Sequence, residues 1–204
     1  MPGRTKTCKR QQILNALTSM LEKSPGGRVT TAKLADELGM SEAAIYRHFP
    51  SKTKIFEGLI EQIDDTLFKR INDLRCDASS ALDYCEQTLA TILSFSEANP
   101  GLSRILSGDA LAGEAERLRS KALEMNERLE ALLSKAISDA ERNDGMIPSI
   151  PATAAANLIF STIEGRISQF VRSGFKRMPT THWPLQWQHL SQNLFSTTPH
   201  QGVC

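Results

Sequence analysis

The sequence predicts an all-α protein in which a small basic head precedes a larger helical body. Apolar residues recur at helical spacing almost throughout, and no run of alternating β-branched residues qualifies as a strand. Residues 1–54 hold ten Lys and Arg against four acidic residues, whereas residues 55–204 hold 14 bases and 19 acids. This asymmetry suggests that the head meets a polyanion, although a solvated basic tail would give the same count.

Length and composition narrow the class of protein. At 204 residues and 40% hydrophobic content, the chain can build one or two domains with a real core. It has no apolar run of the ~18 residues that a membrane span needs and no apolar core of a signal peptide, so we expect a cytoplasmic protein without membrane contact. The four cysteines lack metal-ligand spacing, and no nucleotide-binding or hydrolase motif occurs. We therefore expect neither an enzyme nor a cofactor or metal site.

The head is predicted to contain three helices. An apolar stripe marks a first helix over residues 13–21, which Ser24-Pro25-Gly26-Gly27 ends. Thr30 or Thr31 can cap a short second helix that ends at Gly39. Ser41 caps a third helix, and Pro50 closes it.

The body is predicted to hold the remaining helices. Ser51 opens a long helix, and the later apolar stripes fall over residues 82–93, 102–106, 118–137, 158–171 and about 184–195. We expect a helix-turn-helix domain over residues 1–51 with a basic tail over 1–9, a body over 52–195, and a disordered tail over 196–204.

Residues 30–56 carry the functional signal. Small and apolar residues allow two short helices to cross closely, and Gly39 can adopt the positive φ that reverses the chain. The exposed face of the second of these helices would offer Ser41, Glu42, Tyr46, Arg47 and His48. This pattern indicates DNA binding, and the alternative is an ordinary helical hairpin with a polar rim.

The stretch SEAAIYRHFPSKTKIF at residues 41–56, preceded by TTAKLADELGM, closely resembles the DNA-binding head of the TetR family. NPGLSRIL and FVRSGFKRMPT, farther along the chain, resemble a subgroup of that family that acts in nucleoid occlusion. Such proteins bind palindromic chromosomal sites and, while bound, antagonise polymers of the division GTPase FtsZ. The resemblance thus implies a nucleoid-associated homodimer, with several dimers side by side on DNA. It also implies two partners, DNA and the C-terminal tail of FtsZ, and no small-molecule ligand.

The resemblance also implies site residues. Thr30, Tyr46, His48, Lys52 and Thr53 correspond to the family's DNA contacts. Bases would be read from the front of the recognition helix, at Ser41, Ala43 and Ala44, and Arg47 lies on the same face.

For the FtsZ surface, the resemblance implies Gln62, Arg70 and Asn99. Arg70 could hold a carboxylate of an acidic peptide. The chain departs from its relatives here. It reads SFSEANPG at residues 94–101, where relatives commonly read GFGERNPG, and Gln62 stands where an aromatic residue is usual.

The last two long helices are expected to form a dimer interface. Their apolar stripe would pair with its copy as a four-helix interface. It comprises Leu158, Ile159, Ile163, Ile167, Phe170 and Val171 on the first of these helices, with Leu190 and Leu194 on the second. Alternatively, the stripe closes only the core of its own chain. A second functional possibility is a ligand-responsive repressor with a pocket in the body, but the wealth of Leu, Ile and Ala there favours a packed core.

Overall fold

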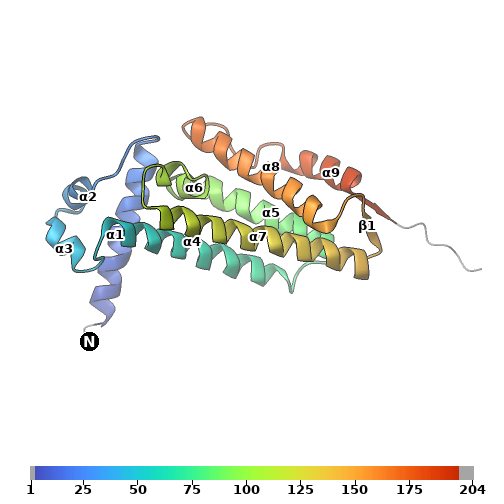
Figure 1. Ribbon diagram of the computed structural model, residues 1–204, viewed down its shortest axis with the longest axis horizontal. Coiled ribbons are helices and arrows are strands. Elements are labelled where there is room, and N and C mark those ends of the chain that lie inside the picture. The colour runs from blue at the N-terminus through green and yellow to red at the C-terminus, as the bar shows by residue number, and fades with distance from the viewer. Residues whose placement is uncertain (1–2, 198–204) are drawn as a thin grey trace, which may run out of the picture.

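The structure is a computed structural model that describes residues 3–197, and the side chains of residues 9–196. It is an elongated helical protein, with α1–α3 (the head) at one end of a bundle of the later helices (the body) (Figure 1). The elements are α1 (Gly3–Lys23), α2 (Thr31–Leu38), α3 (Glu42–Tyr46), α4 (Lys52–Leu74), α5 (Ala81–Ala98), α6 (Pro100–Leu106), the 3₁₀ turn η1 (Asp109–Leu111), α7 (Glu116–Asn143), β1 (Met146–Pro148), α8 (Ala152–Arg172), α9 (Trp183–Leu194) and β2 (Phe195–Thr197). The predicted helical architecture is confirmed.

The predicted caps set the ends of the head helices. Thr30, Ser41 and Ser51 are the N-caps of α2, α3 and α4, and each side-chain oxygen accepts a bond from a backbone N–H three residues on. Gly39 ends α2 with φ 61°, a left-handed conformation that favours glycine. These local signals fix the sharp turns between the short helices.

α1 extends back to Gly3, so most of the segment expected as a basic tail is helical. Two expectations about the rest of the chain are corrected. The expectation of no strand is wrong at two places, because β1 and β2 form a short antiparallel ribbon in which Ile147 pairs with Ser196. The first two residues of the expected disordered tail therefore lie in a strand, and residues 198–204 of that tail lie outside the described residues.

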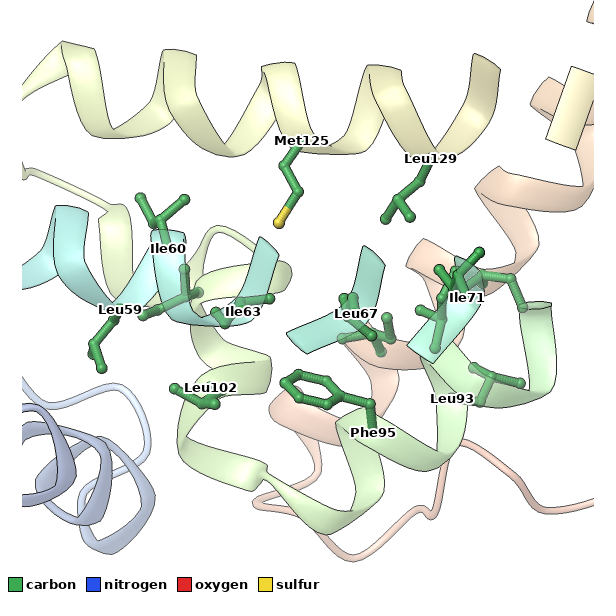
Figure 2. Packing of buried hydrophobic residues seen from close by; sticks show 14 of the residues in the cluster. Leu59, Ile60, Ile63, Leu67, Ile71, Leu93, Phe95, Leu102, Met125 and Leu129 are labelled. Carbon is green, nitrogen blue, oxygen red and sulfur yellow. The ribbon is translucent and has the colours of Figure 1, made fainter. Parts of the chain in front are cut away.

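The core of the body surrounds α4. In Figure 2, Ile63 and Leu67 of α4 lie between Met125 and Leu129 of α7 on one side and Phe95 of α5 on the other. All of these side chains are at most 3% exposed. Within the described part of the chain, no helix is both long and apolar enough to cross a membrane.

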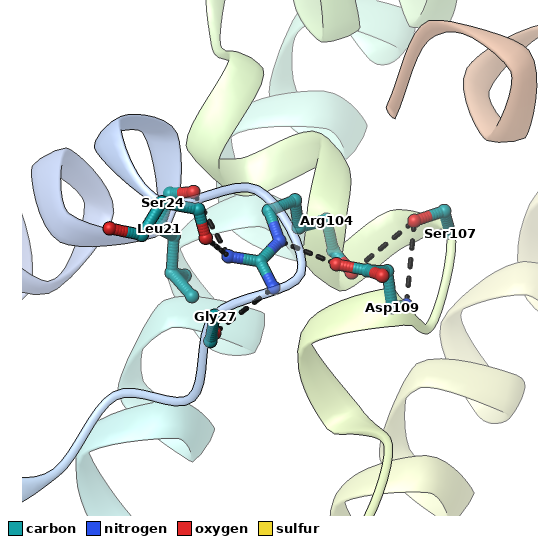
Figure 3. A network of polar contacts seen from close by, with 6 residues as sticks. All are labelled: Leu21, Ser24, Gly27, Arg104, Ser107 and Asp109. Carbon is teal, nitrogen blue, oxygen red and sulfur yellow. Dashed lines mark hydrogen bonds and ion pairs between the residues drawn. The ribbon is translucent and has the colours of Figure 1, made fainter. Parts of the chain in front are cut away.

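Head and body are joined by close packing and by a buried arginine. A Cβ added to Gly101 on α6 would lie 2.2 Å from the Thr18 carbonyl oxygen of α1, so only glycine permits this approach. Arg104 of α6 is 2% exposed. It donates to the carbonyl oxygens of Leu21, Ser24 and Gly27, at 3.1, 2.7 and 3.3 Å, and pairs with Asp109 (Figure 3). The guanidinium thus joins the end of α1 to the body.

Candidate nucleic-acid interface

The helix-turn-helix is held by a small apolar core between α1, α2 and α3. Ile13 and Leu17 of α1 are buried together with Leu34 of α2, Ile45 of α3 and Phe49. Because this core uses the inner faces, the outer face of α3 is left to solvent at the free end of the molecule (Figure 1). A short helix presented in this way is the geometry by which helix-turn-helix proteins enter a major groove.

The predicted base-reading residues lie along α3. Ser41, Ala43 and Arg47 are exposed, whereas Ala44 is half-buried. Ser41 Oγ accepts a bond from the Ala44 N–H at 3.2 Å, so Ser41 orders the start of the helix. The guanidinium of Arg47 has no ion-pair partner among the described residues, which leaves its charge available to a phosphate.

Thr30 and Tyr46 lie where α2 and α3 come together, and Tyr46 contacts Thr31, the residue after Thr30. Thr30 is exposed, and its Oγ1 accepts from the Lys33 N–H at 3.3 Å. Tyr46 is 41% exposed, and its hydroxyl donates to Thr31 Oγ1 at 3.2 Å. The phenol ring is therefore fixed on the surface beside the first turn of α2.

His48 is half-buried behind α3, and its Nδ1 has no hydrogen-bond partner among the described residues. Its carbonyl oxygen accepts a bond from Arg10 Nη1 of α1 at 2.7 Å. The Arg10 guanidinium also lies 4.1 Å from the centre of the Phe49 ring. Arg10 therefore supports the end of the recognition helix, a role that sequence reasoning missed because only the fold brings residues 38 positions apart together.

Lys52 and Thr53 occupy the first turn of α4, where both are half-buried. Lys52 is not free: its Nζ lies 2.5 Å from Oε1 of Glu114, in the loop before α7. One turn later, the carboxylate of Glu57 is buried between Lys54 and Arg117, at 2.6 and 2.8 Å. The hydrogen bond from Lys54 keeps the pKa of Glu57 below its usual value, and the charge of Arg117 acts in the same direction.

The partner residues expected on the body do not form one cluster. Arg70 lines an open groove of about 500 Å³ between α4 and α5, together with Leu74, Ala90 and Ser94. Its guanidinium lies 5.8 Å from the centre of the Phe95 ring. Gln62 instead accepts a bond from Gln11 of α1, and Asn99 donates to the Phe95 carbonyl oxygen at the end of α5. Neither is among the residues that line this groove.

The expectation of a dimer interface made by the α8 stripe is corrected. Five of its six residues, Ile159, Ile163, Ile167, Phe170 and Val171, are at most 5% exposed within the single chain, and only Leu158 is exposed, at 46%. They close the chain's own core because α8 packs on α7. The free face of α8 and α9 carries Leu158 and Leu185, the latter 68% exposed, and an open groove lined by Thr162, Gly165, Gln169 and His189.

Comparisons with known structures identify the fold. The fatty acid degradation regulator FadR from Bacillus halodurans is 17% identical, with a TM-score of 0.76, over 90% of this chain and 98% of that one. FadR from Bacillus subtilis, solved in complex with stearoyl-CoA, is 17% identical, with a TM-score of 0.73, over 90% of this chain and 98% of that one.

Sequence comparisons identify the family. Residues 13–59 match the model of bacterial regulatory proteins of the tetR family, and residues 80–195 match the SlmA-like model of the tetracyclin repressor-like C-terminal domain. The nucleoid occlusion factor SlmA of a Marinomonas species is 48% identical over 93% of this chain and 96% of its own. SlmA of Shewanella pealeana is 46% identical over 97% of this chain and 100% of its own. These relatives are not enzymes, in line with the expectation for this chain. The chain belongs to the SlmA family of TetR-type nucleoid occlusion factors.

Proposed function

We propose that this protein is a nucleoid-associated DNA-binding dimer that occupies palindromic chromosomal sites and, while bound, antagonises FtsZ polymers. The observation that carries the proposal is an exposed recognition helix on a chain that is nearly half identical to SlmA proteins over almost its full length. The division septum would then be kept away from DNA that has not yet segregated.

The DNA contacts are proposed at Thr30, Ser41, Ala43, Ala44, Tyr46, Arg47, His48, Lys52 and Thr53. Two kinds of contact are expected from this set. The exposed small residues of α3 can approach base edges, whereas Tyr46, Arg47 and Lys52 suit phosphates and sugars. Lys52 would have to exchange Glu114 for a phosphate oxygen, or share its charge between them.

The FtsZ contact is proposed in the groove between α4 and α5. Arg70 at the groove edge can hold a carboxylate, while Leu74 and Ala90 offer apolar surface to an extended peptide. Gln62 and Asn99 would act outside the groove, by supporting the packing of α4 on α1 and the end of α5. The altered segment 94–98 adjoins the groove at Ser94.

Dimerisation is proposed through the free face of α8 and α9. Leu185 and Leu158 are large apolar side chains in contact with water, which is a common mark of a protein interface. Two heads related by a two-fold axis would read a palindrome.

A ligand-responsive repressor receives less support. The segment of the body between α5, α7 and α8 is filled by buried side chains such as Leu89, Ile137, Ile159 and Phe160, each at most 4% exposed. A packed interior of this kind favours a function on the outer surface of the body.

The test is sedimentation of FtsZ–GTP polymers with the purified protein, in the presence and absence of a palindromic duplex selected by the protein. We expect polymer loss only when the duplex is present, because bound dimers offer several FtsZ sites at high local concentration. Equal polymer loss without DNA would exclude a DNA-dependent mechanism. No polymer loss despite tight DNA binding would favour the repressor.

Variants separate the two surfaces. Arg70→Asp should abolish polymer loss while DNA affinity is unchanged, and Lys69→Asp, an exposed lysine one position earlier on α4, is the matched control. Tyr46→Ala should weaken DNA binding and therefore also remove the effect on polymers.

A further inference from the structure

The segment from the middle of α8 through the loop between α8 and α9 is basic, whereas the rest of the body is acidic. Residues 55–164 hold ten bases and 19 acids, whereas residues 165–204 hold four bases and no acid. All four bases, Arg166, Arg172, Lys176 and Arg177, lie between the middle of α8 and the loop that follows it. A uniformly basic segment in an acidic body indicates an anionic partner.

The cations at the end of α8 and in this loop are available to such a partner. Arg172, Lys176 and Arg177 are exposed, and none of them has an ion-pair partner among the described residues. Lys176 and Arg177 line a groove of about 410 Å³ that also contains Gln169 and His182 and that no acidic side chain lines. Most other cations of the body, such as Lys121 and Arg128, are paired with carboxylates. Within the described part of the chain, Lys69, Arg70 and Arg75 are not.

Hydrogen bonds order the backbone of the loop that carries these charges. Arg166 donates to the carbonyl oxygens of Pro179 and Thr181 and to the Gln186 side chain. Ser173 Oγ accepts from the N–H groups of Lys176 and Arg177, at 3.1 and 2.9 Å.

An aromatic contact adds to this order. The centre of the Phe175 ring lies 5.2 Å from the centre of the Phe170 ring, and the backbone of Phe175 is left-handed, with φ 64°. A charged loop that is already ordered loses little conformational entropy on binding.

The loop also lies at the head end of the body. Thr180 donates a hydrogen bond to Glu97 in the last turn of α5, and the next helix, α6, packs against α1. Figure 1 accordingly shows the C-terminal end of α8 at the end of the bundle that carries the head, opposite β1. A pair of such loops would flank the two-fold axis if the free faces of α8 and α9 pair.

From this position and charge we infer that the end of α8 and the α8–α9 loop form a second DNA-contacting surface, in which Arg172, Lys176 and Arg177 bind backbone phosphates outside the grooves read by the recognition helices. The inference rests on the proposed function. Because the contacts involve phosphates only, they add affinity and salt dependence without sequence preference.

The experiment compares two double variants with the full-length parent on the duplex that the parent selects. Lys176→Gln with Arg177→Gln should weaken binding about tenfold. It should also reduce the magnitude of the slope of log affinity against log salt concentration by about two to four for a dimer, because each lost phosphate contact removes about 0.9 from that slope. Lys69→Gln with Arg75→Gln removes one lysine from the last part of α4 and the arginine that caps its C-terminus, and should change neither quantity. Sedimentation must show the same oligomeric state for all three proteins.

Each outcome decides a separate point. If the loop variant matches the control in affinity and slope, the loop does not contact DNA. If it binds DNA like the parent but loses binding to vesicles of phosphatidylglycerol, the partner of the loop is a membrane and the DNA assignment is overturned. If Tyr46→Ala leaves DNA binding intact, the proposed function itself fails, whatever the loop variants do.

Discussion

Lys52 and Glu114 form an ion pair, with 2.5 Å between Nζ and Oε1, although they are 62 positions apart in the chain. Lys52 begins α4 beside the recognition helix, and Glu114 belongs to the loop before α7. Their side chains are only 30% and 16% exposed, so water screens the attraction less than it does at an open surface. The body therefore neutralises one of the cations that we propose for DNA binding.

Glu114→Gln should strengthen binding to the selected duplex. The substitution leaves Lys52 its full charge for a phosphate and removes a carboxylate that repels the DNA backbone. We expect an affinity gain of about two- to fivefold, equivalent to no more than about 1 kcal/mol, measured by fluorescence anisotropy at fixed salt.

Glu116→Gln is the control for that variant. It removes the same charge two positions away, from a side chain that is 76% exposed and paired with Arg119. An equal gain in both variants would mean that net charge alone is responsible. A loss of affinity in Glu114→Gln would show instead that the carboxylate orients Lys52 for binding.

Arg104→Met should destabilise the protein by about 3 kcal/mol. The substitution leaves three backbone carbonyl oxygens and the Asp109 carboxylate without their buried donor. Urea unfolding followed by circular dichroism measures the loss. Arg119→Met, in an exposed ion pair on α7, should stay within about 0.5 kcal/mol of the parent. A similar small change for Arg104→Met would mean that the head is joined to the body by apolar packing alone.

Leu185→Glu should dissociate the proposed dimer. A carboxylate at this 68% exposed position would be buried without a partner if the free faces of α8 and α9 pair, so the dimer dissociation constant should rise at least about tenfold. Analytical ultracentrifugation measures it. Leu123→Glu alters a 58% exposed leucine on α7 and should leave the association unchanged. Dissociation by the α7 variant alone would move the interface to that helix.

Local features of the fold were predictable from sequence, whereas contacts between distant segments were not. Thr30, Ser41, Ser51 and Gly39 were identified because a cap or a left-handed turn depends on a few neighbouring residues. The β1–β2 ribbon was missed because three-residue strands are too short to show an alternating pattern.

For the candidate site, too, local patterns were predictable from the sequence and contacts between distant residues were not. The periodicity of α8 shows that a stripe is buried, but not whether it packs against its own chain or a copy, and Ile159 and Ile163 prove to face their own core. Glu114 carries no signal in its local sequence, and it meets Lys52 only because the loop before α7 folds back onto α4. The basic segment without acidic residues after Glu164 is visible in the sequence, but a single charge count over residues 55–204 hides it.

The stability of the protein should depend on Glu57 in acidic solution. Its folded-state pKa lies below the ordinary value of 4.5, so the carboxylate stabilises the fold above that pH. The contribution is lost as the pH falls through the lower, folded-state pKa, because the unfolded chain then binds its proton more readily than the folded one. Glu57→Gln should therefore be less stable than the parent at pH 7, and the difference should shrink steadily below about pH 4.5.

Urea unfolding at a series of pH values tests this dependence. Glu61→Gln is the matched control, because it removes an exposed carboxylate from the same helix, and its ion pair with Lys121 is open to water. We expect that control to differ from the parent by less than about 0.5 kcal/mol at every pH. If the gap between Glu57→Gln and the parent stays constant from pH 7 to acid, the loss comes from packing of the side chain. In that case the charge of Glu57 does not link α4 to Arg117 of α7 in the way that the buried geometry indicates.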